Sequence, residues 1–258
     1  MNVIVLNSGS NGNAVYVESP ASGSAVLLDC GISRRQIELR LKVHGRHPQN
    51  LCAVFITHEH GDHVRGLPVL TKLYHVPTYI TEPTFRRMHR NRPWRGHRFM
   101  GNTGTVTVDD ITVQAFPKSH DASDPVYFIV SIGGRRFLYA TDLGEHDDSV
   151  AAALADVDAA LIESNYDEGM LETGPYPEYL KARIRAAHGH LSNLQAVDLL
   201  RRHANGHLRT LILGHLSENN NTPEIVQREM DLLFEERGDF RPRVVIASRY
   251  SVGEVLVV

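Results

Sequence analysis

The stretch ITHEHGDHVRG, residues 56–66, places three histidines and two acidic residues within six positions, from His58 to His63. It continues LCAVFI, residues 51–56, an apolar and β-rich segment that predicts a buried strand. A loop that leaves a rigid strand is where proteins usefully place ligand-binding groups. The stretch therefore predicts a functional loop at the carboxyl end of a strand.

The spacing inside this loop indicates two groups of metal ligands. His58 and His60 lie two residues apart, so both rings point the same way if the backbone is extended. Gly61 permits a turn that directs Asp62 and His63 elsewhere. Imidazole nitrogen and carboxylate oxygen together suit borderline and hard divalent cations, and two clusters favour two ions. The alternatives are a solvated histidine-rich loop or an expression tag, and the internal position argues against a tag.

Three further candidate ligands each follow a predicted strand. A single histidine after a strand is more often a surface residue, but three such positions in one chain indicate a shared site. They are His120 after ITVQAF, Asp142 after RRFLYA and His215 after LRTLIL.

The rest of the chain predicts an α/β fold. Strand-like segments fill the first third and residues 105–140, and helices and strands alternate from residue 148 onward. This order favours two mixed sheets with helices outside, a four-layer α/β/β/α sandwich forming a single domain over residues 1–258. Helices are expected at residues 33–43, 64–74, 82–92, 148–154, 177–187, 192–203 and 222–237. Later strands are expected at 158–164, 208–214, 243–248 and 253–258.

Composition sets limits on the class of protein. The 258 residues are 42% hydrophobic and 22% charged, which is typical of a globular chain, and the net charge of -3 indicates no overall affinity for nucleic acid. We expect no signal peptide and no membrane span, because no apolar run reaches about 18 residues. Two cysteines, Cys30 and Cys52, make no disulfide framework and are expected to be small core residues in a reducing cytoplasm.

The ligand series resembles the metallo-β-lactamase superfamily: H-x-H-x-D-H, then His, then the Asp of TD, then a last His. The resemblance implies one metal held by His58, His60 and His120, and a second held by Asp62, His63 and His215. It implies that Asp142 bridges the two, beside a bridging water or hydroxide. Some antibiotic-hydrolysing members use a cysteine ligand, and neither cysteine here lies near a motif.

Further motifs resemble one branch of that superfamily. LNSGSNGNAVYV, LLDCGIS, IESNYD, GHLSN and LGHLSENNNTPEIV are similar to the YycJ (WalJ) branch of bacterial DNA-processing nucleases, for which 5′-to-3′ exonuclease activity is described. The resemblance implies a phosphodiesterase that uses two divalent ions, with a metal-bridging hydroxide attacking phosphorus and DNA as the partner. Zinc is the expected ion, and manganese and iron(II) are alternatives for a mixed site.

Two residues are candidates for proton transfer. His190 lies two residues before a predicted helix start, where free N–H groups favour anions. It is a candidate proton donor or phosphate clamp, with Glu163 fixing its tautomer, as ribonuclease-type members pair Glu and His. Asp62 is a candidate for orienting the nucleophile as well as binding metal. The alternative is a structural glutamate and a surface histidine.

Three segments are candidates for substrate contact. SGSNGN is a polar, glycine-rich turn that can donate to phosphates, or is only a turn. GHLSN precedes a helix, where Ser192 with Gln195 also fits a plain capping box. RRMHRNRPWRGHR carries six arginines and a tryptophan, which suit phosphates and bases, although a charge run is usually a solvated face. The candidate contacts from these segments are Ser8, Ser10, Asn11, Asn13, Ser192, Asn193, Arg87, Arg90 and Arg95, and Asn165 of IESNYD is a further candidate.

Three other functions remain open at this point. A thioester or lactone hydrolase of the glyoxalase kind usually adds a helical domain, and only about forty residues follow His215. An RNA-processing ribonuclease needs an arm or an inserted domain, and only about seventy residues separate Asp142 from His215. A non-enzymatic regulatory protein commonly loses ligands that this chain keeps. The sequence does not determine the oligomeric state.

Overall fold

The computed structural model describes residues 1–88, 96–145 and 148–258. The chain divides into two compact units. The first comprises Met1–Pro117, Ala122–Arg135 and Ser248–Val258, and the second comprises Lys118–Asp121 and Arg136–Ala247. The single domain that the sequence suggests stays a prediction.

The first unit contains a seven-stranded sheet in the order β14-β1-β2-β3-β4-β5-β6. Strands β1, β2 and β3 pair in antiparallel fashion, and β3, β4, β5 and β6 are parallel. Because parallel strands end at the same edge, the segments that follow β3, β4, β5 and β6 leave from one edge of this sheet. The bounds are β1 Asn2–Asn7, β2 Ala14–Glu18, β3 Ala25–Leu28, β4 Leu51–Phe55, β5 Thr78–Ile80, β6 His97–Phe99 and β14 Leu256–Val257.

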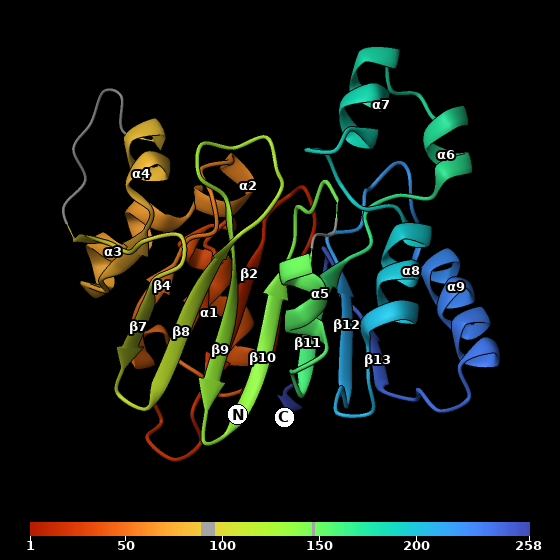
Figure 1. The fold of residues 1–258 in the computed structure, drawn as a ribbon. Helices are drawn as coiled ribbons and strands as arrows, with labels where there is room; N and C mark the ends of the chain where they lie inside the picture. The colour runs from red at the N-terminus through yellow and green to blue at the C-terminus, as the bar shows by residue number, and fades with distance from the viewer. Residues whose placement is uncertain (89–95, 146–147) are drawn as a thin grey trace. The chain divides into compact units, whose positions relative to one another are not determined.

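Short helices accompany this sheet and share its core. Helix α1 buries Ile37 and Leu41 against sheet residues such as Ile4 and Tyr16. Ser33 caps α1 by accepting a hydrogen bond from the backbone N–H of Gln36, as its sequence indicates. The helices are α1 Arg34–Val43, the 3₁₀ turn η1 Pro48–Asn50, α2 Gly61–Val64, α3 Leu67–Tyr74 and α4 Glu82–Met88 (Figure 1).

The second sheet has the strand order β13-β12-β11-β10-β9-β8-β7. In the first unit, β7 Thr105–Val108, β8 Ile111–Pro117 and β9 Val126–Ile132 are antiparallel. The strands β10 Arg135–Ala140, β11 Ala159–Glu163, β12 Thr210–Gly214 and β13 Arg243–Ile246 are parallel, and from Arg136 onward they belong to the second unit. Gly133 and Gly134 have φ values of 57° and 79°, as a two-residue hairpin turn requires.

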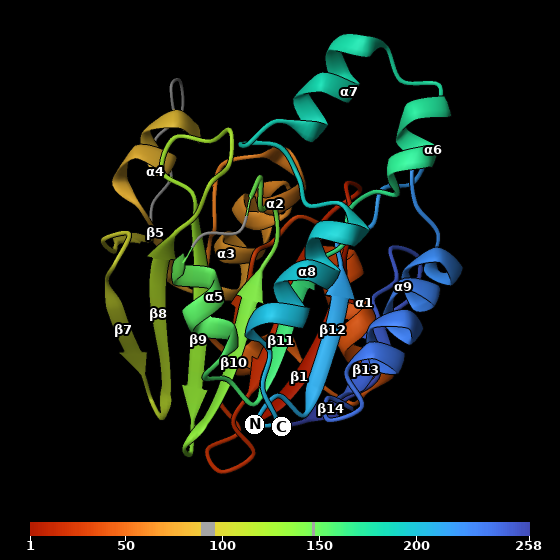
Figure 2. The same cartoon turned by 45° about the vertical axis from the view of Figure 1, so that its right-hand side comes forward.

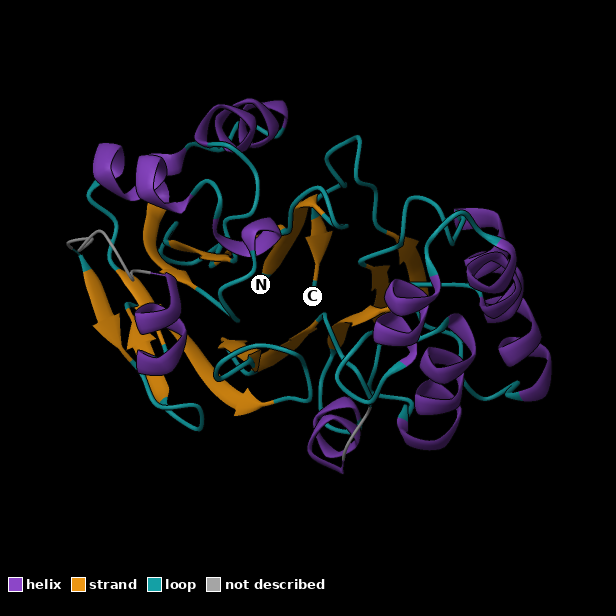
Figure 3. Cartoon of the chain, turned by 90° about the horizontal axis from the view of Figure 1, so that it is seen from above, coloured by secondary structure: helices purple, strands orange, loops and turns teal. Residues whose placement is uncertain are grey.

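Helices of the second unit lie along its parallel strands. Figure 2 shows α8 Asn193–His203 and α9 Pro223–Glu236 beside β12, and α6 Glu168–Thr173 and α7 Glu178–Arg185 at one end of them. Helix α5 is Asp148–Leu154. Ser192 forms the full capping box that the sequence predicts. In each unit the helices lie beside the strands rather than between them (Figure 3).

Some expected elements are wrong. The helix expected over residues 64–74 is two helices, α2 and α3, interrupted at Gly66. A Cβ at Gly66 would lie 1.9 Å from the carbonyl oxygen of Ile32, so two segments of backbone meet there. The strand expected at 253–258 is reduced to β14, and β5, β6 and α6 are not anticipated. The helix expected over 82–92 is α4 to Met88, and residues 89–92 lie outside the described residues.

The two cysteines differ from each other. Cys30 is fully buried, as predicted, but Cys52 is half-buried and its Sγ lies 3.2 Å from Oδ2 of Asp109. The core assignment is therefore wrong for Cys52. Within the described ranges, no helix has both the length and the apolar composition needed to cross a bilayer.

Candidate metal centre

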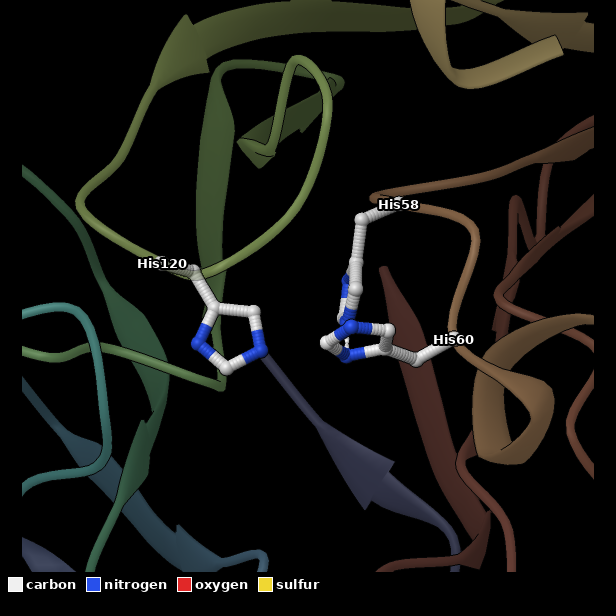
Figure 4. A group of neighbouring side chains, drawn as sticks. All are labelled: His58, His60 and His120. Carbon is white, nitrogen blue, oxygen red and sulfur yellow. Dashed lines mark hydrogen bonds between the residues drawn. The ribbon is translucent and has the colours of Figure 1, made fainter. Parts of the chain in front are cut away.

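In the first unit, His58 and His60 lie on the loop that follows β4, as predicted. Nε2 of His58 is 3.1 Å from Nδ1 of His60, and their ring centroids are 4.7 Å apart. Figure 4 shows these two rings close together and also draws His120, which belongs to the second unit. Two imidazoles this close are suited to holding one cation between them.

A buried carboxylate orients His63 on helix α2. Oδ2 of Asp29 lies 2.7 Å from Nδ1 of His63, and neither side chain is exposed. Thr57 donates to Asp29 from its backbone N–H at 2.9 Å and from its hydroxyl. A carboxylate against Nδ1 favours the tautomer with its proton on Nδ1 and its lone pair on Nε2, the arrangement common to histidines that bind metals. This role of Asp29 is not predicted from the sequence, although the LLDCGIS motif contains the residue.

Asn13, from the SGSNGN turn, lies against this histidine. Its backbone N–H donates to the carbonyl oxygen of Asp62 at 2.7 Å, and its Nδ2 is 3.1 Å from Nε2 of His63. A Cβ at Gly31 would lie 1.6 Å from the same Asp62 oxygen, so only glycine fits there. The turn therefore supports the His63 loop directly.

The other members of the turn have different surroundings. Asn11 donates to the carbonyl oxygen of Arg249 at 3.1 Å and accepts from Asn7 at 3.0 Å. Ser8 is buried, and Ser10 is exposed. Phosphate contact by Ser8, Ser10 and Asn11 stays a prediction.

The second unit contains its own cluster of ligand-type side chains. Asp142 follows β10, Glu163 ends β11 and His215 follows β12, so three parallel strands deliver them to one edge. With His190, their ligand atoms all lie within 4.8 Å of one another. Asp142 and His215 have φ values of 54° and 56°, and Asp29 in the first unit has 57°. Left-handed backbone is unfavourable for such residues and is concentrated at functional sites.

Glu163 is the centre of this cluster because four N–H groups point at its carboxylate. Oε1 lies 2.8 Å from Nδ1 of His190 and 2.7 Å from Nδ1 of His215. Oε2 accepts from the backbone N–H groups of Leu143 at 2.7 Å and Leu191 at 3.2 Å. Burial alone would raise the pKa of Glu163, but the two histidines lower that pKa to about 2. An ionised Glu163 keeps both histidines protonated on Nδ1 and directs both Nε2 atoms away from it.

His120 lies on the short loop 118–121 of the second unit. Burial lowers its pKa to about 4, against an opposing effect of Asp142. Its Nδ1 donates to the carbonyl oxygen of Gly189 at 3.1 Å, so the lone pair of the neutral ring is on Nε2, which lies 3.4 Å from Oδ1 of Asp121. The loop is fastened by Asp121 to Arg183 at 2.6 Å and by Ser119 to the carbonyl oxygen of Ala187 at 2.7 Å.

Lys118, which the sequence analysis did not single out, is buried beside this loop. Its Nζ donates to the carbonyl oxygen of Thr141 at 2.6 Å. Thr141 directly precedes Asp142, so the buried ammonium group of Lys118 offsets negative charge in this region. A lysine in a PKSH segment carries no sequence signal that separates it from a surface lysine.

Three of the remaining candidate contacts form hydrogen bonds within the second unit, and the three arginines lie on α4 or beyond it in the sequence. Ser192 caps α8, and Asn165 donates to the carbonyl oxygen of His215 at 2.7 Å. The side chain of Asn193 exchanges two hydrogen bonds with that of Asn221, at 2.8 and 3.0 Å. Their contact with substrate stays a prediction. Arg87 is exposed at the end of α4, and Arg90 and Arg95 lie outside the described residues.

Comparison with known proteins assigns the class. Residues 24–216 match the family described as the beta-lactamase superfamily domain. The chain belongs to this superfamily, whose metallo-β-lactamase members the ligand series resembles. It is 35% identical over 233 residues to the exodeoxyribonuclease WalJ of Streptococcus pneumoniae serotype 2, covering 88% of this chain and 85% of that one. It is 33% identical over 238 residues to the exodeoxyribonuclease YycJ of Bacillus anthracis, covering 91% and 89%.

A solved structure confirms the fold. The metallo-β-lactamase fold protein YhfI from Bacillus subtilis superposes with a TM-score of 0.72 over 98% of this chain and 99% of that chain, at 17% identity. At this identity the likeness speaks to the fold alone. The predicted α/β sandwich with two mixed sheets and flanking helices is therefore confirmed.

Proposed function

We propose that this chain is a metal-dependent phosphodiesterase that removes nucleotides from DNA ends, in the 5′-to-3′ direction. The observation that carries the proposal is the 33–35% identity, over most of the chain, to two proteins named exodeoxyribonucleases. The histidines that buried carboxylates orient in both units support the proposal, because phosphodiester hydrolysis by this superfamily depends on metal ions held by such groups.

The proposed ligands fit divalent cations. His63 and His215 each direct Nδ1 at a buried carboxylate, which favours a proton on Nδ1 and a lone pair on Nε2, the protonation state that a metal requires. We assign one ion to His58, His60 and His120, a second to Asp62, His63 and His215, and Asp142 to both. Zinc suits this imidazole-rich set, with manganese or iron(II) as alternatives. When bound, such ions lower the pKa of a water molecule and neutralise charge on the phosphate.

His190 is the proposed proton donor. Its Nδ1 lies 2.8 Å from Oε1 of Glu163 and its side chain is 22% exposed, so Nε2 is the ring nitrogen that we assign to the substrate. An alkoxide leaves phosphorus poorly, and a proton delivered from Nε2 to the leaving oxygen assists that step. Glu163 keeps the ring oriented through its contact with Nδ1 of His190. Asp62, on α2, is 22% exposed, and its proposed roles are to orient the attacking water and to bind metal.

A metal-reconstitution assay tests the proposal. The purified chain is analysed for metal content, stripped, reloaded with zinc, manganese or iron(II), and given 5′- and 3′-end-labelled duplex DNA, RNA and a thioester panel. We expect stepwise release from 5′ ends of DNA. Preferential cleavage of RNA or a thioester, or loss from 3′ ends, would contradict the assignment. His60→Ala and Asp142→Asn are expected to abolish hydrolysis and to lower the metal content.

A further inference from the structure

A second binding feature lies in the first unit, at the same edge of its sheet as the His-rich loop. The carboxyl ends of β5 and β6 border a pocket of about 360 Å³. Its lining includes Thr81, Glu82, Phe99, Gly101, Asn102 and Asp124. Because β4, β5 and β6 are parallel, this pocket and the loop carrying His58 leave the sheet in the same direction. Figure 2 shows α4 above β5.

A short loop joins the pocket to the His-rich segment. The backbone N–H and the hydroxyl of Ser123 both donate to Oε1 of Glu59, at 2.9 and 2.6 Å. The next residue, Asp124, accepts from Nδ2 of Asn102 at 3.0 Å through its carboxylate and from the hydroxyl of Thr81 at 3.3 Å through its carbonyl. The pocket floor is therefore fixed relative to Glu59 by hydrogen bonds within one unit.

The chemistry of the pocket favours a flat, uncharged ligand that carries N–H donors. Phe99 is 51% exposed, although large aromatic side chains are usually buried. Its ring is held edge-to-face by Phe85, with centroids 5.5 Å apart, and is supported by His97 at 5.0 Å. The carboxylate of Asp124 is an acceptor and repels a phosphate placed in the pocket itself, whereas that of Glu82 pairs with Arg86 at 2.7 Å.

We propose that this pocket binds a nucleobase of the DNA strand, stacked on Phe99, with the base N–H groups facing Asp124. The inference rests on the proposed function, because it deepens the assignment of DNA as substrate. Stacking on an aromatic side chain tolerates every base, which suits an exonuclease that must accept any sequence. The pocket holds an unpaired base near the end being processed, while the phosphate lies outside it.

The direct test compares binding of two single-stranded oligonucleotides to the metal-free full chain by fluorescence anisotropy. One carries normal bases, and the other carries abasic sugars at its 5′ end. We expect the intact chain to prefer the normal oligonucleotide by about 5- to 100-fold. Phe99→Ala removes this preference and Phe99→Trp retains it. Val69→Ala, which changes another exposed apolar residue of the same unit at 57% exposure, leaves the preference unchanged.

The outcomes separate this inference from the proposed function. If Phe99→Ala, shown to be folded by its thermal unfolding curve, keeps both the affinity and the base preference, the pocket assignment is overturned. If the intact metal-loaded chain cuts no DNA, the proposed function fails whatever Phe99 does. A chain that cuts DNA but shows no base preference overturns the pocket alone.

Discussion

Replacing Glu163 with glutamine isolates the role of one carboxylate, because four N–H groups converge on it. Glutamine keeps the shape but has a single acceptor oxygen. If that oxygen faces the histidines, its NH₂ group meets the N–H groups of Leu143 and Leu191, and each donor left unsatisfied in the core costs about 1–3 kcal/mol. If the NH₂ group faces the histidines instead, both rings must move their proton from Nδ1 to Nε2. The second arrangement costs less, so we expect it to prevail.

This preference predicts an effect on metal binding that exceeds the effect on folding. A proton on Nε2 of His215 blocks the lone pair that the proposed metal needs, so affinity should fall about 10- to 100-fold, or about 1.4–2.8 kcal/mol. The free energy of unfolding of the metal-free chain should fall by only about 1–2 kcal/mol. Competition against a chelator measures the first quantity, and urea unfolding in excess chelator measures the second.

Two further variants serve as controls for the effect of Glu163→Gln. Glu163→Ala removes both acceptors and leaves a cavity, so it should destabilise the metal-free chain by several kcal/mol more than Glu163→Gln. Glu224→Gln, on the exposed first turn of α9, should leave the metal affinity unchanged and lower the free energy of unfolding by no more than about 1 kcal/mol. If Glu163→Gln binds metal as tightly as the natural chain, the tautomer argument is wrong.

Three other substitutions test the remaining parts of the site. Asp29→Asn should weaken metal binding about 10- to 100-fold, because its amide disfavours the Nδ1 proton of His63; equal metal content after dialysis would argue against this. His190→Ala should keep the metal ions but slow DNA hydrolysis about 10²- to 10⁴-fold in single-turnover assays, and full activity would remove the proton-donor role. Gly31→Ala should destabilise the chain by about 3 kcal/mol or more in urea unfolding, since its Cβ would meet backbone at 1.6 Å. Gly61→Ala, with nothing within 4 Å, is the matched control, and an equal loss in both would refute the packing argument.

Local patterns predicted much of this protein because its ligand residues follow strands. A β-rich run followed by His, Asp or Glu identifies the end of a parallel strand, and the ends of β10, β11 and β12 carry Asp142, Glu163 and His215 as expected. The pairing of Glu163 with His190 also follows the sequence, and their 2.8 Å contact is present.

Other features depend on contacts between segments distant in the chain. Asp29 precedes His63 by 34 residues, so no local pattern indicates their hydrogen bond. The interruption at Gly66 arises because backbone of the 30–32 segment occupies the space that a Cβ would need. Strand β6 lies in a basic stretch whose composition does not indicate a strand. It is a strand because it pairs with β5.

The left-handed backbone at Asp29, Asp142 and His215 restricts how this protein can diverge. A side chain branched at Cβ would cost about 1–2 kcal/mol in the backbone at each position before its chemistry mattered. In mutational scanning, most substitutions at these positions will therefore combine backbone strain with the loss of the ligand group. Asparagine and glycine tolerate this backbone, so their effects report the loss of the ligand group alone. In a paralogue that has lost catalytic activity, we expect Asn or Gly at these positions, because both residues tolerate the left-handed backbone that the lost ligand residue adopted.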